Sequence, residues 1–160
     1  MSEVERYTLD EAHREFAKRA NGQVWQLLGK SERTQAENEE MEFAAFASLY
    51  HWLYVGTEVH RQRGEWLIAH VYTVLGNADL AIKHAHRCLE LTEEYKGQME
   101  DFDIAYAYEG VARANALGGD SEVAEKYLEL AKAAGEAIAD SQSKEIFMGD
   151  LESGEWYGIR

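Results

Sequence analysis

Apolar side chains recur along most of the chain at the spacing of three and four residues that one face of an α-helix requires. The clearest example lies in residues 40–56, where Phe43, Phe46 and Tyr50 follow this spacing. Comparable patterns cover residues 57–76, 77–95, 101–119 and 120–140, and a shorter one begins at residue 141. The pattern predicts an all-α fold of about six to seven helices.

Capping residues mark where several of these helices begin and end. Thr8 with Glu11 three residues later forms a capping-box pattern, which predicts a first helix from about residue 9. This helix either continues or is interrupted at Asn21-Gly22. Gly76 follows another apolar run and suits a helix C-cap. The absence of proline, which breaks helix interiors, favours the same helical chain.

The helix predicted over residues 40–56 carries apolar side chains on nearly all of its faces, since Leu49, Trp52 and Leu53 lie away from the main stripe. Such a helix is usually central to its domain or lies at a subunit contact. Internal packing is the interpretation we favour. A contact with a second copy of the chain is the alternative.

An internal repeat relates two parts of the chain, as small residues recur forty-three positions apart. Both segments read as a helix, a turn with Leu-Gly and a second helix. Small side chains at these places let two antiparallel helices approach closely, and the turn glycine can adopt positive φ. The matched residues are Ala69, Gly76, Ala81 and Cys88 in the first segment, and Ala112, Gly119, Ala124 and Ala131 in the second.

This spacing resembles the tetratricopeptide repeat, a helix–turn–helix unit that stacks into a solenoid. The first unit also has Tyr72 at the aromatic position, whereas the second has Asn115 there. The forty-three-residue period exceeds the usual one of about 34 residues and resembles the longer-helix variants of the superfamily. The resemblance implies a single domain with atypical capping helices at 1–60, two clearer repeats at 61–137, and a C-terminal helix with an aromatic tail at 138–160.

The resemblance further implies a concave surface that binds a peptide or protein partner, and it does not imply any enzyme activity. The first helix of each pair should line this surface, and Trp, Tyr and Arg are frequent anchors of interfaces. The alternative for the rings of Trp66 and Tyr106 is that they fill the space between repeats. The expected binding residues are Arg63, Trp66, His70, Tyr106, Glu109 and Arg113.

A different class of function remains open on the same sequence. A small-molecule-binding or enzymatic helical domain would need a pocket, and the candidate residues for it are Tyr50, His51, Trp66 and His70. We expect no catalytic residue, no cofactor and no metal site. His84 and His86 lie about 200° apart on a helix, and Cys88 falls where tight helix packing needs a small side chain. A metal site assembled across helices is the weaker alternative.

The net charge, the longest uncharged run and the cysteine content indicate which partners and which compartment to expect. Thirty acidic and sixteen basic residues give a net charge of −14, which opposes binding to nucleic acid and to anionic lipid. The longest uncharged run, residues 43–57, is too short to cross a bilayer. We therefore expect the partner to be a protein, a peptide or a second copy that forms a homodimer. We also expect a cytoplasmic location, because a single cysteine fits a reducing compartment.

The C-terminal segment "GEWYGIR" is too short to form another helix pair. It either folds back onto its own domain or occupies the groove of a partner subunit. We favour the fold-back, because docking within one chain has the higher effective concentration.

Overall fold

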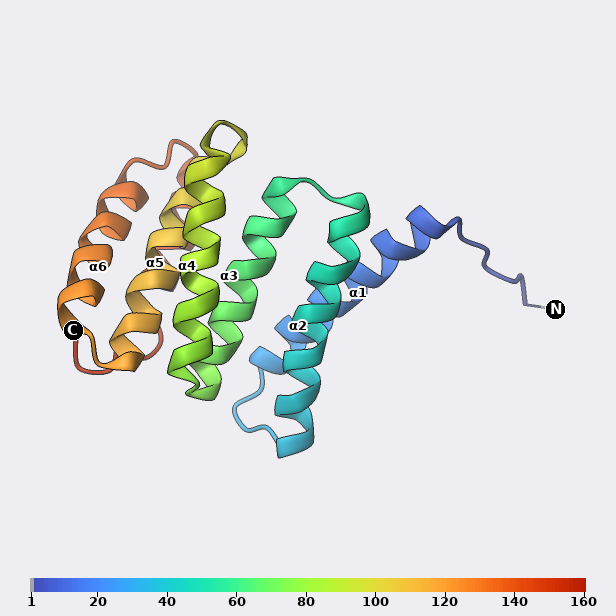
Figure 1. Cartoon of the computed structure of the whole chain (residues 1–160), viewed down its shortest axis with the longest axis horizontal. Helices are drawn as coiled ribbons and strands as arrows, with labels where there is room; N and C mark the ends of the chain where they lie inside the picture. Colours follow the sequence, from blue (N-terminus) through green and yellow to red (C-terminus); the bar gives the residue numbers. More distant parts are fainter. Residues whose placement is uncertain (1) are drawn as a thin grey trace.

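The computed structural model describes residues 2–160, and in this part of the chain all regular structure is helical. Seven α-helices follow one another along the chain, and a short 3₁₀ turn, Lys96–Gln98, separates the fourth from the fifth. The helices are α1 Leu9–Leu28, α2 Gln35–Val55, α3 Glu58–Leu75, α4 Ala78–Glu94, α5 Asp101–Gly118, α6 Ser121–Glu136 and α7 Ser141–Glu152. Figure 1 shows α1 to α6 in chain order from right to left across the view.

The predicted cap at Thr8 is present, as its side chain accepts a hydrogen bond from the Glu11 N–H and the Glu11 side chain accepts one from the Thr8 N–H. Helix α1 then continues without the interruption considered at Asn21-Gly22. A glycine within a helix costs about 1 kcal/mol relative to alanine. Burial of Ala17 and Val24 on either side of this point offsets that cost.

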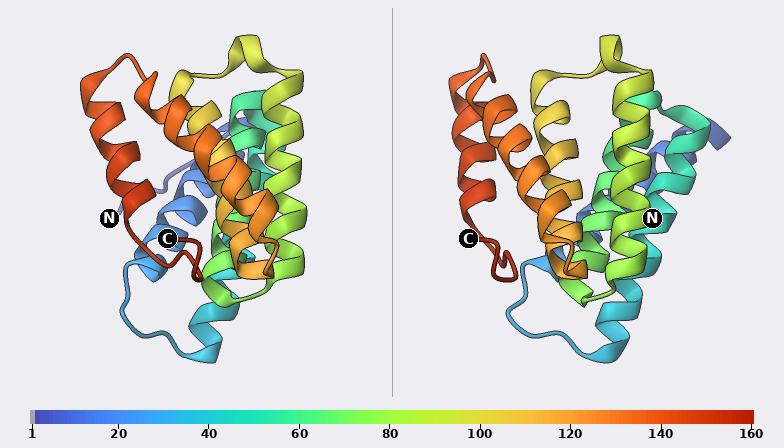
Figure 2. Two further views of the ribbon diagram at one scale, coloured as in Figure 1. Left: turned by 90° about the vertical axis from the view of Figure 1, so that its left-hand side faces the viewer. Right: turned by 60° about the vertical axis from the view of Figure 1, so that its left-hand side comes forward.

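The helices form antiparallel hairpins that pack against one another, α1 with α2, α3 with α4, and α5 with α6. Helix α7 lies against both α5 and α6 at the end of the stack (Figure 2). Helix α3 also contacts α5 directly, so the first helices of successive hairpins are neighbours. This arrangement is the antiparallel helical stack that the sequence predicts.

The forty-three-residue repeat corresponds to the α3–α4 and α5–α6 hairpins. Gly76 and Gly119 both adopt left-handed conformations, with φ of 79° and 83°, at the C-caps of α3 and α5. In both turns the residue after the glycine, Asn77 or Asp120, caps the next helix through its side chain. The small residues of the repeat, namely Ala69, Ala81, Cys88, Ala112, Ala124 and Ala131, are all buried.

Internal packing does not account for the apolar side chains of α2. The buried positions of this helix are Met41, Ala45 and Ser48, and Ser48 donates a hydrogen bond to the carbonyl of Ala17 on α1. In contrast, Phe43 is 71% exposed. The same outer surface of α2 carries four further exposed side chains: Phe46, Tyr50, Leu53 and Tyr54. The favoured interpretation was therefore wrong for this surface.

The C-terminal tail folds back onto its own domain. Trp156 is buried, and its indole N–H donates to the carbonyl of Leu151 at 2.9 Å. Tyr157 donates from its hydroxyl to the carbonyl of Thr73 at 3.3 Å, which ties the tail to α3. Within residues 2–160, no helix has the length and apolar character that crossing a membrane would demand.

Candidate functional site

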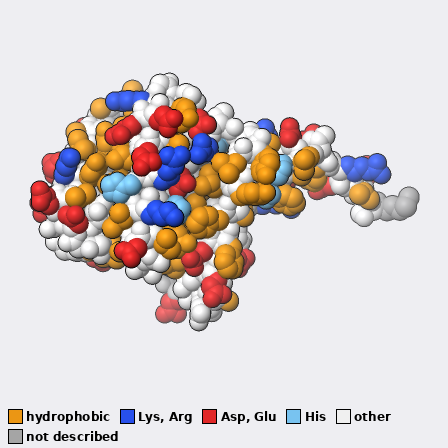
Figure 3. Space-filling view, in the orientation of Figure 1, with side chains coloured by type: hydrophobic (Ala, Val, Ile, Leu, Met, Phe, Trp, Pro, Cys, Tyr) orange, Lys and Arg blue, Asp and Glu red, His pale blue; other side chains and the backbone are white. Residues whose placement is uncertain are grey.

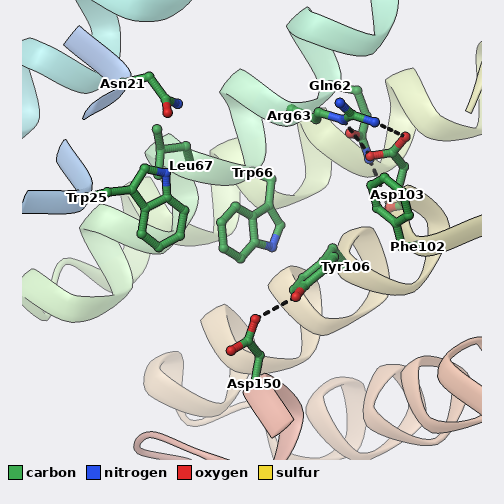
Figure 4. A pocket seen from close by; sticks show the side chains of 10 residues that line it. All are labelled: Asn21, Trp25, Gln62, Arg63, Trp66, Leu67, Phe102, Asp103, Tyr106 and Asp150. Atoms are coloured by element: carbon green, nitrogen blue, oxygen red, sulfur yellow. Dashed lines mark hydrogen bonds and ion pairs between the residues drawn. The ribbon is translucent and has the colours of Figure 1, made fainter. Parts of the chain in front are cut away.

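A cavity of about 400 Å³ opens where α1, α3, α5 and α7 come together. Figure 4 shows its lining side chains, which come from all four helices. Five of the ten lining side chains are aromatic or apolar, and the other five are polar or charged. The lining residues are Asn21, Trp25, Gln62, Arg63, Trp66, Leu67, Phe102, Asp103, Tyr106 and Asp150.

Two tryptophans form the largest apolar surface of this cavity. The ring centroids of Trp25 on α1 and Trp66 on α3 are 6.2 Å apart, with ring planes 21° from parallel. Figure 4 shows the two rings side by side. Tyr106 on α5 meets Trp66 edge to face at 5.4 Å and 71°. Trp25 remains 47% exposed, so a ligand can reach its ring.

Trp66 is held by a buried ion pair behind it. Its indole N–H donates to one carboxylate oxygen of Glu109 at 3.0 Å, and the other oxygen accepts from Arg113 at 2.7 Å. Both partners of the ion pair are less than one tenth exposed. The remaining Arg113 N–H groups donate to carbonyls at the end of α7 and in the tail, those of Asp150, Ser153 and Glu155. One guanidinium thus links the orientation of Trp66 to the position of α7.

A second ion pair closes the opposite edge of the cavity. Arg63 donates two hydrogen bonds to the buried Asp103 carboxylate, at 2.8 and 3.0 Å. Its guanidinium carbon lies 5.2 Å from the centre of the Phe102 ring. The charge of Arg63 is therefore neutralised within the chain, although half of its side chain is exposed.

Asp150 lies at the cavity edge formed by α7. It accepts a hydrogen bond from the Tyr106 hydroxyl at 2.5 Å (Figure 4). Burial, together with this carboxylate, raises the pKa of Tyr106, so the phenol stays protonated and remains a donor. Asp150 is exposed and has no Lys, Arg or His partner among the ion pairs of residues 2–160.

A smaller hollow of about 270 Å³ adjoins the first and shares Trp25, Trp66, Tyr106 and Asp150 with it. His70 lines this hollow, and its ring stacks on Trp66 at 4.9 Å with planes 9° apart. Burial lowers the pKa of His70, which keeps its ring neutral at pH 7. We call the two hollows together the aromatic groove.

All of the concave-surface residues expected from the sequence line the aromatic groove. They differ in role, however. Trp66 and Tyr106 are half-buried and present ring surface to the groove, whereas Glu109 and Arg113 are buried and hold other side chains in place. The rings of Trp66 and Tyr106 therefore fill space between helices and also line an open cavity.

Tyr50, His51, Trp66 and His70 do not come together around one pocket as proposed. Trp66 and His70 line the aromatic groove, whereas His51 lines a separate hollow between α1 and α2. The ring nitrogens of His51 and His13 on α1 are 2.8 Å apart. Tyr50 is 54% exposed on α2. The physical reason is the placement of α2 in the outer layer, with its aromatic side chains on the outside.

Sequence reasoning missed Trp25, Phe102, Asp103 and Asp150 as parts of the groove. For Trp25 a signal exists, because "VWQLLGK" resembles the start of a repeat, whose first helix would bring Trp25 near the first helix of the next unit. The ring of Trp25 does meet that of Trp66 on α3. The contribution of Asp150 depends on how α7 docks, and the repeat has no counterpart for that helix.

The cysteine and one of the histidines outside the groove are buried or paired within the fold. Cys88 is buried, as predicted, and burial raises the pKa of its thiol. His84 pairs with Glu65 at 2.6 Å and meets the ring of Phe46 edge to face. Within residues 2–160, no three His, Cys, Asp or Glu side chains gather closely enough to hold a metal ion.

Comparisons of the chain with models of protein families, with curated proteins and with solved structures find no match.

Proposed function

We propose that the protein is a non-catalytic interaction module, similar to a short tetratricopeptide-repeat array, that binds a peptide segment of a partner protein in the aromatic groove. The observation that carries this proposal is the convergence of Trp25, Trp66, Phe102 and Tyr106 on one open cavity. Tryptophan and tyrosine dominate binding energies at interfaces, because they bury large apolar areas and lose little conformational entropy.

The groove is also held in shape before any ligand arrives. The Glu109–Arg113 pair fixes Trp66, and the hydrogen bond to Asp150 fixes Tyr106. Side chains that are already ordered lose less entropy on binding, so more of the contact energy appears as affinity.

The charged groups of the groove favour this module over an enzyme. Asp103 and Glu109 are buried in ion pairs with arginines, and each also accepts a hydrogen bond from a group that it orients. Such carboxylates act as positioning groups. The net charge of −14 and the single, buried cysteine support a cytoplasmic protein whose partners are neither nucleic acids nor membranes.

Panning of random peptides against the immobilised protein, followed by calorimetry of the selected peptides, tests the proposal. We expect Trp25→Ala to weaken binding about tenfold or more, because truncating an aromatic hot spot removes at least ~1.4 kcal/mol. Trp25 is half exposed, so this variant should fold.

Phe43→Ala is the matched control, since it removes an exposed aromatic ring from α2, outside the groove. It should bind the selected peptides as the unmodified protein does. Equal binding by the Trp25→Ala variant, or the failure of any peptide to bind, would overturn the proposal.

A second candidate function is self-association. The observation that favours it is the exposed apolar surface of the first hairpin, over which hydrophobic side chains gather in Figure 3. Large contiguous patches of this kind mark interaction sites. We call this surface the α1–α2 face, and it consists of Phe16, Phe43, Phe46, Tyr50, Leu53 and Tyr54.

A further inference from the structure

The aromatic groove combines aromatic ring surface with one exposed carboxylate, that of Asp150, which forms no ion pair with a cation of residues 2–160. From this combination we infer that the peptide bound there is anchored by an arginine side chain, whose guanidinium stacks on Trp25 and Trp66 and pairs with Asp150. This inference rests on the proposed function and names the chemistry that the groove selects.

The same chain shows twice how an arginine occupies such a site. Arg63 lies over the ring of Phe102 and pairs with Asp103. Arg113 lies 4.1 Å from the centre of the Trp156 ring and pairs with Glu109.

Asp150 with the adjacent tryptophans is a third set of the same kind, but no arginine of residues 2–160 pairs with its carboxylate. An arginine supplied by a partner would complete it.

Charge in the groove favours a cationic anchor. The two arginines that line the hollows are neutralised by their own carboxylates, which leaves Asp150 as the unbalanced charge. A cation over the face of tryptophan gains from the ring quadrupole, and tryptophan is the best ring for this interaction. The chain's net charge of −14 attracts basic segments at longer range and repels acidic ones.

The shape of the groove selects guanidinium over ammonium. The rings of Trp25 and Trp66 lie side by side with similar planes (Figure 4), so they form a platform open on one side. A planar guanidinium can stack on such a surface while its edge donates two hydrogen bonds to a carboxylate. An ammonium group has neither the plane nor the fork.

Titration of the 15N-labelled protein with acetyl-Ser-Arg-Ser-amide tests the inference, with indole N–H signals of Trp25 and Trp66 as the readout. The same peptide with citrulline in place of arginine keeps the shape but removes the charge. We expect the arginine peptide to bind about tenfold more tightly than the citrulline peptide, as hydrogen bonds to charged groups are the stronger ones. The lysine peptide should fall between them.

Asp150→Asn is the decisive variant, because its amide oxygen still accepts the hydrogen bond from Tyr106 while the charge is lost. It should reduce the preference for arginine over citrulline to the part that stacking on the tryptophans contributes. Glu145→Gln removes the same charge from an exposed position of α7 and should keep the preference.

Three outcomes would overturn the inference. They are equal affinity for the arginine and citrulline peptides, tighter binding of the lysine peptide than of the arginine peptide, and an unchanged preference for arginine in Asp150→Asn. The proposed function fails separately. If selected peptides bind in a Trp25-dependent but Asp150-independent manner, the groove still binds peptides and only the arginine anchor is wrong. If Trp25→Ala has no effect on their binding, the proposed function itself is wrong.

Discussion

At the scale of single residues, the two turn glycines show most directly how the sequence determines the structure. Gly76 and Gly119 occupy equivalent places and both have positive φ. No atom lies within 4 Å of where a Cβ would be added at either position. The requirement for glycine there therefore comes from the backbone conformation alone.

We expect Gly76→Ala and Gly119→Ala each to lower the free energy of unfolding by about 1–2 kcal/mol, the cost of a left-handed conformation for a residue with a Cβ. Gly22→Ala is the control, because Gly22 lies within α1 with open space around it. It should raise stability by about 0.5–1 kcal/mol. Urea unfolding measures all three, and equal effects in the helix and in the turns would contradict this account.

We expect His70 to make the stability of the protein dependent on pH. Burial lowers the pKa of His70 from the ordinary value of 6.5, and the charge of Arg113 acts in the same direction. The carboxylates of Glu109 and Asp150 act in the opposite direction and raise it. The unfolded chain therefore binds a proton more readily than the folded one. The stability contributed by the neutral ring is present above about pH 6.5 and is lost as the pH falls below it.

Between about pH 7.5 and about pH 5.5, we expect the free energy of unfolding to fall more steeply in the unmodified protein than in His70→Gln, which cannot take up this proton. Urea unfolding at both pH values gives, for each protein, the difference between its two free energies of unfolding. Since both proteins share all other titrating groups, identical differences would show that His70 is not responsible.

At the scale of helices, the position of α7 depends on one close approach. A Cβ on Gly135 of α6 would lie 2.5 Å from Cε1 of Phe147 and 2.8 Å from the sulfur of Met148. Phe147 is fully buried, so its ring cannot move aside easily. This contact, together with the hydrogen bond from Arg113 to the carbonyl of Asp150, helps to position α7.

Gly135→Ala should therefore displace α7 and lower the free energy of unfolding by about 1–3 kcal/mol, as other overpacked cores do. Amide hydrogen exchange should accelerate across Ser141–Glu152. Gly149→Ala is the control within α7, because no atom lies within 4 Å of the added Cβ. If both variants exchange at the rate of the unmodified protein, the close approach does not position the helix.

The elements that could be predicted from the sequence are those fixed by local patterns. The cap at Thr8, the turn at Gly76 and the buried small residues follow from spacing and residue type. The exposure of Phe43 could not be predicted from the sequence. Helix α2 carries apolar residues on nearly all of its faces, so their periodicity does not indicate which face is buried. Asp150 could not be assigned to the groove, because the repeat gives no position for α7.

At the scale of the whole molecule, the stack has two different ends. Helix α7 and the tail cover the last hairpin, whereas the first hairpin carries the exposed α1–α2 face. Terminal units of repeat proteins need polar outer surfaces to stay apart from other copies. The first hairpin carries exposed aromatic rings instead, and Phe46 among them meets Tyr72 and His84 of the next hairpin. Association between two such faces would cover these rings.

We expect sedimentation velocity to show a dimer that dissociates on dilution, and Phe43→Glu to be monomeric, since burying an unpaired charge at the contact is unfavourable. Ile146→Glu is the matched control, because Ile146 is an exposed apolar residue on α7 at the other end of the stack. A monomeric unmodified protein at high concentration would contradict self-association through the α1–α2 face.

Binding of a peptide in the aromatic groove can be followed at the tryptophans of the chain. The chain has four tryptophans, of which Trp25 and Trp66 line the groove while Trp52 and Trp156 do not. Their indole N–H signals in a 15N-labelled sample report each location separately. With a peptide selected by panning, we expect the signals of Trp25 and Trp66 to move and saturate together while that of Trp52 stays in place. Movement at Trp52 with no change at Trp25 and Trp66 would contradict binding in the groove.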